Sequence, residues 1–445
     1  MKNQSRNILA TLALCSLTLS SCGLYTNFNS EEIPSDVAGE NITLPDTAVV
    51  ALPTWKEVFT DSHLQGLITK ALAQNADLEV ARLNTQQAKR VLTTSKLAYL
   101  PSIVFSPEIS KGIDIPMEYK LPVAASWELD LFGKLHNQKR QAKAAFEQTK
   151  AYKQAVQSQL IAGVATNYYS LLLADKQLAW TKESYAILES TLMTMEALKE
   201  VGMQTQAAVL QTRGNLNELE ITLNNLELQV ALLENNLCLL LQESPKAISR
   251  GSLDETIIDY PIDETISLAV LSNRPDVKVA EMNLAQSFYG VNYARAALYP
   301  NITLSAQGGW FNPGDWLLNA LASATQPIFM AGVNRANLAN AKDAYEQQLV
   351  LFEQSLLKAG KEVNDAIVSQ NNSSIQKAIA SEQVATYNKA VETTQALMDS
   401  GMASYLEVLT AQNAYLGSRI NQAAIWHSHA ISQINLFNAL GGGQE

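Results

Sequence analysis

The chain has 445 residues, of which 47% are hydrophobic, 7% aromatic and 17% charged, and its formal net charge at pH 7 is −11. It is therefore too apolar to be a disordered chain and too acidic to bind nucleic acid through a basic face. Its length alone predicts two or three domains, an estimate that does not hold for repeat architectures and membrane barrels.

The amino-terminal segment predicts export and a lipid anchor. Lys2 and Arg6 precede an apolar run over residues 8–19, which has the length of a secretory signal core and is too short to span a membrane. Leu19-Ser20-Ser21-Cys22 then resembles the bacterial lipobox, in which cleavage leaves the cysteine as the lipid-modified first residue. We expect residues 1–21 to be a signal peptide and Cys22 to carry lipid, with an ordinary signal and a chance cysteine as the alternative. Gly23, where Asp would indicate inner-membrane retention, favours the outer membrane, and cleavage would take the net charge from −11 to −13.

The cysteine, histidine and glycine patterns favour no enzyme and no cofactor. Besides Cys22, the mature chain would keep Cys238, which stands in a run of leucines and is expected to be buried. His427 and His429 stand two residues apart on a predicted helix, so they face different sides, unlike the ligands of a metal site. Gly133-Lys134 lacks the upstream glycine of a phosphate-binding loop. We therefore predict no catalytic residues, no metal and no cofactor.

A constant offset of 199 residues relates two halves of the chain. It carries Leu100-Pro101 onto Tyr299-Pro300, Gly133 onto Gly332, and Gly202-Met203 onto Gly401-Met402. Because the offset holds over more than 130 residues, it predicts a duplicated domain rather than a solenoid of short units. The expected divisions are a lipidated extended segment over 22–54, a first repeat over 55–244, a linker over 245–260 and a second repeat over 261–445.

Proline positions separate two long helical regions from the rest. No proline occurs over residues 123–244 or from 328 to the end, and an interior proline costs a helix about 3 kcal/mol. Residues 135–200, if helical throughout, would span roughly 100 Å, which a compact domain of this size cannot enclose. Gly202 and Gly401 interrupt the two regions at equivalent places and predict the turns of two helical hairpins. A heptad seam follows the first turn and consists of Leu216, Leu219, Leu223, Leu226, Val230, Leu233, Leu237 and Leu240.

The segments over 103–110, 119–130, 302–311 and 317–329 predict short strands. Apolar and polar residues alternate along parts of these segments; for example, Ile302, Leu304 and Ala306 would share one face of a strand. Aromatic residues stand near the connections. Lengths near ten residues suit membrane-spanning strands, with edge hairpins of a soluble domain as the alternative. Two hairpins cannot close a barrel, so a barrel would require several subunits.

Four groups of residues carry a family resemblance. They are the helix signature Trp55-Lys56 with Asn75-Ala76-Asp77-Leu78, the strand-to-helix junctions at Pro101, Gly133, Pro300, Pro327 and Gly332, the run from Gly401 to Gln412, and the terminal Ala439-Leu440-Gly441-Gly442-Gly443. In this combination the chain resembles the TolC-type outer membrane factors, the exit ducts of tripartite efflux systems. With its lipobox it is most similar to the NodT-like lipoprotein branch that serves resistance-nodulation-division pumps.

The resemblance implies a mainly α-helical fold with β structure in a homotrimer. Each subunit would give four strands to one transmembrane β-barrel and long antiparallel helical hairpins to a periplasmic α-barrel. The implied function is passive conduction across the periplasm and the outer membrane, opened by rearrangement of the hairpins at the periplasmic end. The implied partners are outer membrane lipid, a periplasmic adaptor (membrane fusion) protein and an inner-membrane resistance-nodulation-division transporter. A type I secretion duct is one alternative; a lipid-anchored coiled-coil adaptor is another, although it would have one hairpin rather than two.

Two sets of residues match functional regions of that family. The hairpin tips match adaptor contacts, at Val201, Gly202, Met203 and Gln204 and at Ser400, Gly401, Met402 and Ala403; a plain helix turn is the alternative. Leu406 matches an apolar ring and Glu407 an acidic ring that constrict the periplasmic entrance, while Thr410 stands where many relatives carry Asp. Carboxylates near a narrow axis would attract cations, and a solvated helix residue is the alternative for Glu407.

Overall fold

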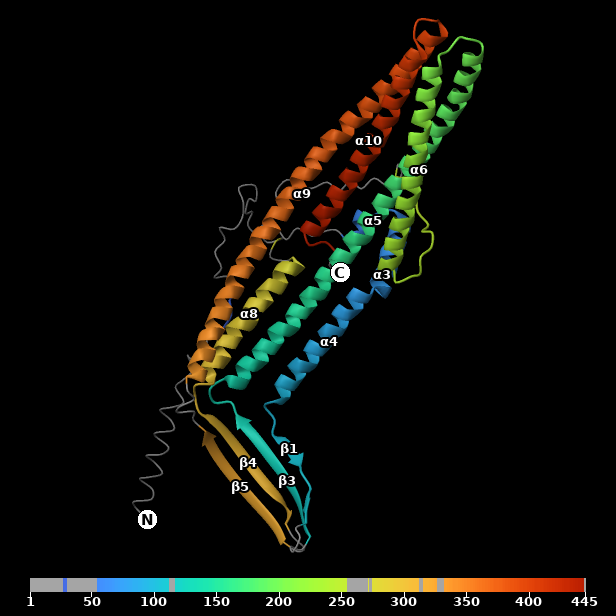
Figure 1. The fold of residues 1–445 in the computed structure, drawn as a ribbon. Coiled ribbons are helices and arrows are strands. Elements are labelled where there is room, and N and C mark those ends of the chain that lie inside the picture. Colours follow the sequence, from blue (N-terminus) through green and yellow to red (C-terminus); the bar gives the residue numbers. More distant parts are fainter. Residues whose placement is uncertain are drawn as a thin grey trace, which may run out of the picture. The chain divides into compact units, whose positions relative to one another are not determined.

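The computed structural model describes residues 27–29, 54–111, 117–253, 271, 274–311, 315–325 and 332–443 (Figure 1). The chain divides into two compact units. The sheet unit comprises Met1–Asp36, Gln86–Thr149 and Val279–Glu353, and the hairpin unit comprises Val37–Thr85, Lys150–Lys278 and Gln354–Glu445. The predicted signal peptide, Cys22 and Pro327 lie outside the described residues.

The two halves of the chain repeat the same series of helices. The first half has α4 (Ala76–Leu97), α5 (Lys134–Glu200) and α6 (Gln206–Leu240), and the second has α8 (Pro275–Ala296), α9 (Val333–Asp399) and α10 (Tyr405–Ala439). Every bound of the second series lies 199 residues after its counterpart, so the predicted duplication is confirmed. Two shorter helices, α2 (Trp55–Val58) and α3 (Ser62–Gln74), precede the first series.

The two longest helices, α5 and α9, have 67 residues each, or about 100 Å of helical rise. They are rich in Ala, Gln, Leu and Lys, which are good helix formers, and both supply residues to both units. Within the part of the chain that the structure describes, no helix is both long enough and apolar enough to cross a membrane.

The sheet unit contains one antiparallel sheet. Its strands are β1 (Ser102–Phe105), β2 (Glu108–Ser110), β3 (Glu118–Leu129), β4 (Asn301–Phe311) and β5 (Asp315–Thr325). β1 and β2 both pair with β3, which pairs with β4, which pairs with β5, and β3 to β5 lie side by side in Figure 1. Among the described strands, the outer edges of β1, β2 and β5 have no partner.

A proline explains why the first predicted strand is divided into β1 and β2. The Pro122 carbonyl of β3 accepts a hydrogen bond from the Ser106 amide at 3.2 Å, and on an antiparallel strand the amide of the same residue points to the same neighbour. Proline has no amide hydrogen, so ladder pairing stops at residues 106–107, where Pro107 is likewise without a donor.

One face of the sheet is apolar. Partners across an antiparallel ladder share a face, so the strand registers assign the side chains directly. This face carries Ile103, Phe105 and Ile109 of β1 and β2, Leu121, Val123, Ala125 and Trp127 of β3, Ile302, Leu304, Ala306 and Trp310 of β4, and Trp316, Leu318, Ala320 and Ala322 of β5. The opposite face carries mainly polar groups, among them Lys120, Ser126, Thr303, Ser305, Gln307 and Asn319. Trp310 pairs with Trp316 at the far end of the sheet, and Trp127 stands near the helices, which gives an aromatic residue at each end.

The junctions between strands and helices are held by side-chain contacts. Asp130 caps α5, because its carboxylate oxygens accept from the amides of Leu135 at 3.1 Å and His136 at 2.7 Å. Gly133 and Gly332, each just before a 67-residue helix, adopt φ of +71° and +80°, which glycine permits. Pro101 and Pro300 directly precede β1 and β4, where a proline prevents the foregoing helix from continuing.

The hairpin unit holds a hydrophobic core where α3, α5, α6 and α10 meet. Its largest fully buried side chains include Phe59, Leu64, Ile68, Tyr168, Tyr169 and Leu237. Arg250 links α5 to α6 beside this core, because its guanidinium forms ion pairs with Asp175 of α5 and Glu234 of α6. Cys238 is buried, as expected, and its thiol contacts the Lys246 carbonyl.

Gly309 offers a test of the strand register. A Cβ at this position would lie 2.4 Å from the Leu121 carbonyl oxygen. The backbone of Leu121 cannot move away without separating β3 from β4. We expect Gly309→Ala to cost about 1–3 kcal/mol and to lower the recovery of folded protein from membranes. Gly308→Ala is the matched control, because its nearest contact is the flexible Leu318 side chain at 3.2 Å. Equal thermal midpoints and yields for the two variants would contradict this close strand approach.

Candidate functional site at the hairpin tips

Both helical hairpins turn through the same hydrogen-bonded motif. At the first tip the Met203 amide donates to the Leu198 carbonyl at 2.8 Å, and Gly202 has φ of +78°. At the second tip the Met402 amide donates to the Leu397 carbonyl at 2.8 Å, and Gly401 has φ of +71°. These are two Schellman turns, in which glycine takes the left-handed position.

Each tip presents apolar side chains to solvent. Val201, Met203 and Met402 are 70%, 72% and 74% exposed. Ser400 is also exposed, and its hydroxyl donates to the Ala396 carbonyl, so it completes the end of α9. Exposed large apolar groups at the end of a rod are typical of a contact surface.

The helix that follows the second tip begins with a capping box. The Ser404 amide and hydroxyl both donate to the Glu407 carboxylate, at 2.6 and 2.9 Å. These hydrogen bonds, the backbone one first, hold the pKa of Glu407 below its usual range. At the equivalent first helix, Thr205 caps through its hydroxyl to the Ala208 amide, and Ala208 occupies the position of Glu407. At this position the second hairpin therefore has an exposed, ionised carboxylate, Glu407, and the first hairpin has none.

A groove of about 1,070 Å³ opens between the two hairpins just below the tips. Four of the predicted residues line it, namely Gln204, Ala403, Leu406 and Thr410. The other seven, namely Val201, Gly202, Met203, Ser400, Gly401, Met402 and Glu407, are not part of its lining. Leu406 is 63% exposed, and the Thr410 hydroxyl donates to the Leu406 carbonyl at 2.8 Å, so this threonine binds its own helix.

Several polar contacts join α5 to α10 and to the residues after it, on the side of this groove away from the tips. At the far end of α10, Ser158 donates to the Gly442 carbonyl at 2.6 Å. Further along, Ser170 and the ring of His427 are 3.0 Å apart, and burial lowers the pKa of that histidine. His429, two residues later, instead contacts Ser373 of α9, so the two histidines face different helices as predicted.

The last charged contact on this α5–α10 line before the groove is centred on Arg419. Its guanidinium lies 4.5 Å from the centre of the Trp180 ring and binds Glu183 at 2.9 Å. Beyond it, the Tyr405 hydroxyl is buried beside Thr191 and Thr212, and none of the described residues gives it a well-formed hydrogen bond. Sequence patterns did not reveal these residues, because single polar residues on a long helix form no motif.

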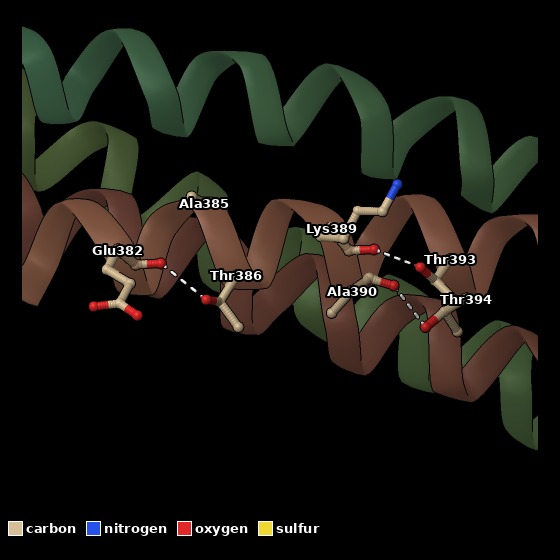
Figure 2. A pocket seen from close by; sticks show the side chains of 7 residues that line it. All are labelled: Glu382, Ala385, Thr386, Lys389, Ala390, Thr393 and Thr394. Atoms are coloured by element: carbon tan, nitrogen blue, oxygen red, sulfur yellow. Dashed lines mark hydrogen bonds between the residues drawn. The ribbon is translucent and has the colours of Figure 1, made fainter.

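A second surface lies on α9 over residues 382–394 (Figure 2). The hydroxyls of Thr386, Thr393 and Thr394 bond back to the carbonyls of Glu382, Lys389 and Ala390 at 2.8–2.9 Å. With their polar atoms satisfied, these threonines and the neighbouring alanines form a shallow surface of mainly small side chains, which Glu382 and Lys389 also line. Such a surface suits close approach of another helix. Among the described residues no group of three metal-ligating acidic, histidine or cysteine side chains comes together.

Comparison with known proteins identifies the family. The family model described as outer membrane efflux protein matches residues 67–242 and again residues 267–442. The probable outer membrane lipoprotein SilC of Salmonella typhimurium is 29% identical over 409 residues, covering 87% of this chain and 88% of that protein. The cation efflux system protein CusC of Escherichia coli K12 is 28% identical over 411 residues, with the same coverage of each chain.

Solved structures agree with the sequence comparison. A crystal structure of CusC has a TM-score of 0.81 and 26% identity, covering 91% of this chain and 99% of that one. The open state of the MtrE outer membrane channel of Neisseria gonorrhoeae has a TM-score of 0.84 and 23% identity, covering 94% and 98%. The predicted fold class and resemblance are confirmed: the chain belongs to the outer membrane efflux protein family and is a protein of the outer membrane.

Proposed function

We propose that this chain is the outer membrane duct of a tripartite efflux system, which receives substrates from an inner-membrane transporter and a periplasmic adaptor. One observation supports this above all: a sheet with one apolar face continues directly into two 67-residue helices, each folded back at a matching exposed tip. The duct would conduct passively, and the relatives' names, which refer to cations and solvents, leave several substrate classes open.

The working unit would be a homotrimer. A sheet of this size cannot close on itself, and its edge strands carry unpaired amide and carbonyl groups that lipid cannot hydrogen-bond. The surface of small side chains on α9 in Figure 2 would receive a neighbouring helix in the same assembly.

The lipid anchor would attach beside the sheet. Asn27, five residues after Cys22, accepts a hydrogen bond from Arg140 at 2.6 Å, and Phe28 packs on Phe288 with ring centres 5.8 Å apart. Five residues reach at most about 18 Å, so a lipid on Cys22 would enter the membrane close to the start of α5.

The tips would meet the adaptor, and the start of α10 would form the periplasmic constriction. An exposed methionine at each of the two equivalent turns, Met203 and Met402, would give a trimer six similar contact points. Leu406, Glu407 and Thr410 would surround the entrance, with Glu407 contributing three negative charges.

The first test concerns the duct itself. Outer membrane fractions should contain a trimer that dissociates only on heating, and the purified protein should give discrete conductance steps in planar bilayers. Cys22→Ala should weaken attachment during assembly without abolishing conductance of the trimers that form. Release of this variant as a soluble monomer would contradict a membrane duct.

The second test concerns the tips. Met203→Glu combined with Met402→Glu would place desolvated charges in the proposed contact and should reduce export at least about tenfold. Met203→Leu with Met402→Leu is the control, because it keeps an apolar tip of similar size. Export is measured as resistance of a deletion host to a panel of drugs, dyes and metal salts, with trimer yield measured alongside. Normal export by the glutamate variant would show that docking occurs elsewhere.

The third test separates the two roles open to Glu407. Gln can replace Glu in a capping box, so Glu407→Gln should keep the start of α10 while removing the charge. We expect a lower cation-to-anion permeability ratio in bilayers with an unchanged thermal midpoint. Glu407→Ala should show the same change in selectivity and a lower midpoint. If selectivity is unaffected in both variants, Glu407 is a helix cap and nothing more.

A further inference from the structure

The helix ends that adjoin the sheet have an unusual charge. They are the ten-residue segments 88–97 of α4, 134–143 of α5, 287–296 of α8 and 333–342 of α9. Together they contain ten Lys and Arg residues and no Asp or Glu, in a chain whose net charge is −11. At the average composition of the chain, forty residues would contain about three cations and four acids. The positive charge is therefore concentrated at one level of the sheet unit.

Chain connectivity places all four segments beside the sheet. Each is joined to a strand by a short connection, from α4 to β1, from β3 to α5, from α8 to β4 and from β5 to α9. Ten residues of helix span about 15 Å, so the charges lie within that distance of the helix ends. The apolar face of the sheet begins at the same level, with Trp127, whose indole N–H donates to the Tyr99 carbonyl at 2.9 Å.

Six of the ten cations are exposed and have no ion-pair partner among the described residues. They are Lys89, Arg90, Lys96, Lys143, Arg335 and Lys342. The acids nearest to them in the chain are Asp343, next to Lys342, and Glu147, four residues after Lys143. The two acids at the junction between β3 and α5 are engaged elsewhere, because Glu128 pairs with Lys134 at 3.0 Å and Asp130 caps α5. The six side chains thus give these helix ends a net positive surface charge, and we call the six together the basic belt.

We propose that the basic belt binds the anionic phospholipid headgroups of the periplasmic leaflet of the outer membrane. This inference rests on the proposed function, because it requires the apolar face of the sheet to lie in that membrane. Headgroups begin where an apolar face ends, and a cation near an anionic surface strengthens binding by about fivefold. Arg140, in the same segment of α5 as Lys143, holds Asn27, so the proposed lipid anchor would enter the same leaflet.

A lipid surface fits the belt better than a protein partner or a soluble anion. The six cations come from three helices and two halves of the chain, and they share only their distance from the sheet. A planar layer of phosphates can reach all of them, and none of the six lines the groove below the tips, the hollows on α9 or the hollow on the sheet.

The experiment compares lipid selection by matched variants. Purified trimer in detergent is incubated with equal amounts of phosphatidylglycerol and phosphatidylcholine, and the lipid that stays bound after gel filtration is quantified. The native protein should retain phosphatidylglycerol at least about tenfold over phosphatidylcholine, and 1 M salt should remove the preference. Two triple variants are tested, Lys89→Gln with Arg90→Gln and Lys96→Gln, and Lys143→Gln with Arg335→Gln and Lys342→Gln.

The control removes three exposed cations of the hairpin unit instead, as Lys182→Gln, Lys358→Gln and Lys361→Gln, so that net charge is matched. The belt variants should lose most of the preference, and the control should keep it. Equal retention of phosphatidylglycerol by native and belt-variant trimers would overturn the belt, as would equal loss in the control. Dissociation of the trimer on heating and conductance in bilayers are measured on each sample, and these test the duct separately from the belt. If one triple variant fails to fold, the other is enough to test the belt.

Discussion

The need to pair every main-chain hydrogen-bonding group of the sheet constrains the rest of the structure. A strand in lipid must have both neighbours, because the hydrocarbon layer supplies neither donors nor acceptors. This chain pairs its strands in one short sheet and leaves two edges open among the described residues. Pro122 and Gly309 fit that pairing, one removing a donor where the adjacent strand is divided and the other allowing the backbones to approach. In the proposed duct the subunit would be complete only in an assembly, and the long helices connected to the sheet would follow the same symmetry.

Several polar contacts join α5 to α10 and to the residues after it. Ser158 and Ser170 of α5 contact Gly442 and His427, Arg419 makes the ion pair between α5 and α10 that lies nearest the groove, and Tyr405 has a buried hydroxyl without a normal partner. A buried polar group without a partner is costly, and α10 carries such groups beside the groove at Tyr405 and nearer the core at Trp426 and Gln433. Local opening draws on the regions with the weakest contacts. If the hairpins rearrange, we expect them to separate at the groove beyond Arg419, where they are already apart.

Much of this architecture could be predicted from the sequence, for physical reasons that differ by element. The offset between Gly202 and Gly401 located both turns, since only glycine takes a positive φ there cheaply, and proline gaps marked both 67-residue helices. The division between β1 and β2 was missed, because it depends on which neighbour the Pro122 carbonyl faces. The turn at Gln242 was missed as well. Gln242 takes φ of +55° at the position equivalent to Gly441, so the turn is preserved although no glycine marks it in the sequence. Contacts such as Arg419 with Trp180 depend on helix pairing, which one sequence does not specify.

The two repeats are alike at the hairpin turns and differ at the helix starts that follow, so the same duplicated fold can provide both a docking surface and a charged entrance. The turns have stayed alike, with the same hydrogen bonds and the same exposed methionine, which suits repeated docking. The helix starts have diverged, since Thr205 caps alone with Ala208 beyond it, whereas Ser404 shares its cap with the carboxylate of Glu407. In a trimer the tips would approximate sixfold symmetry while the charge at the helix starts would remain threefold. The capping bond also favours the ionised form of Glu407, so the interaction that starts the helix also keeps a negative charge at the proposed entrance.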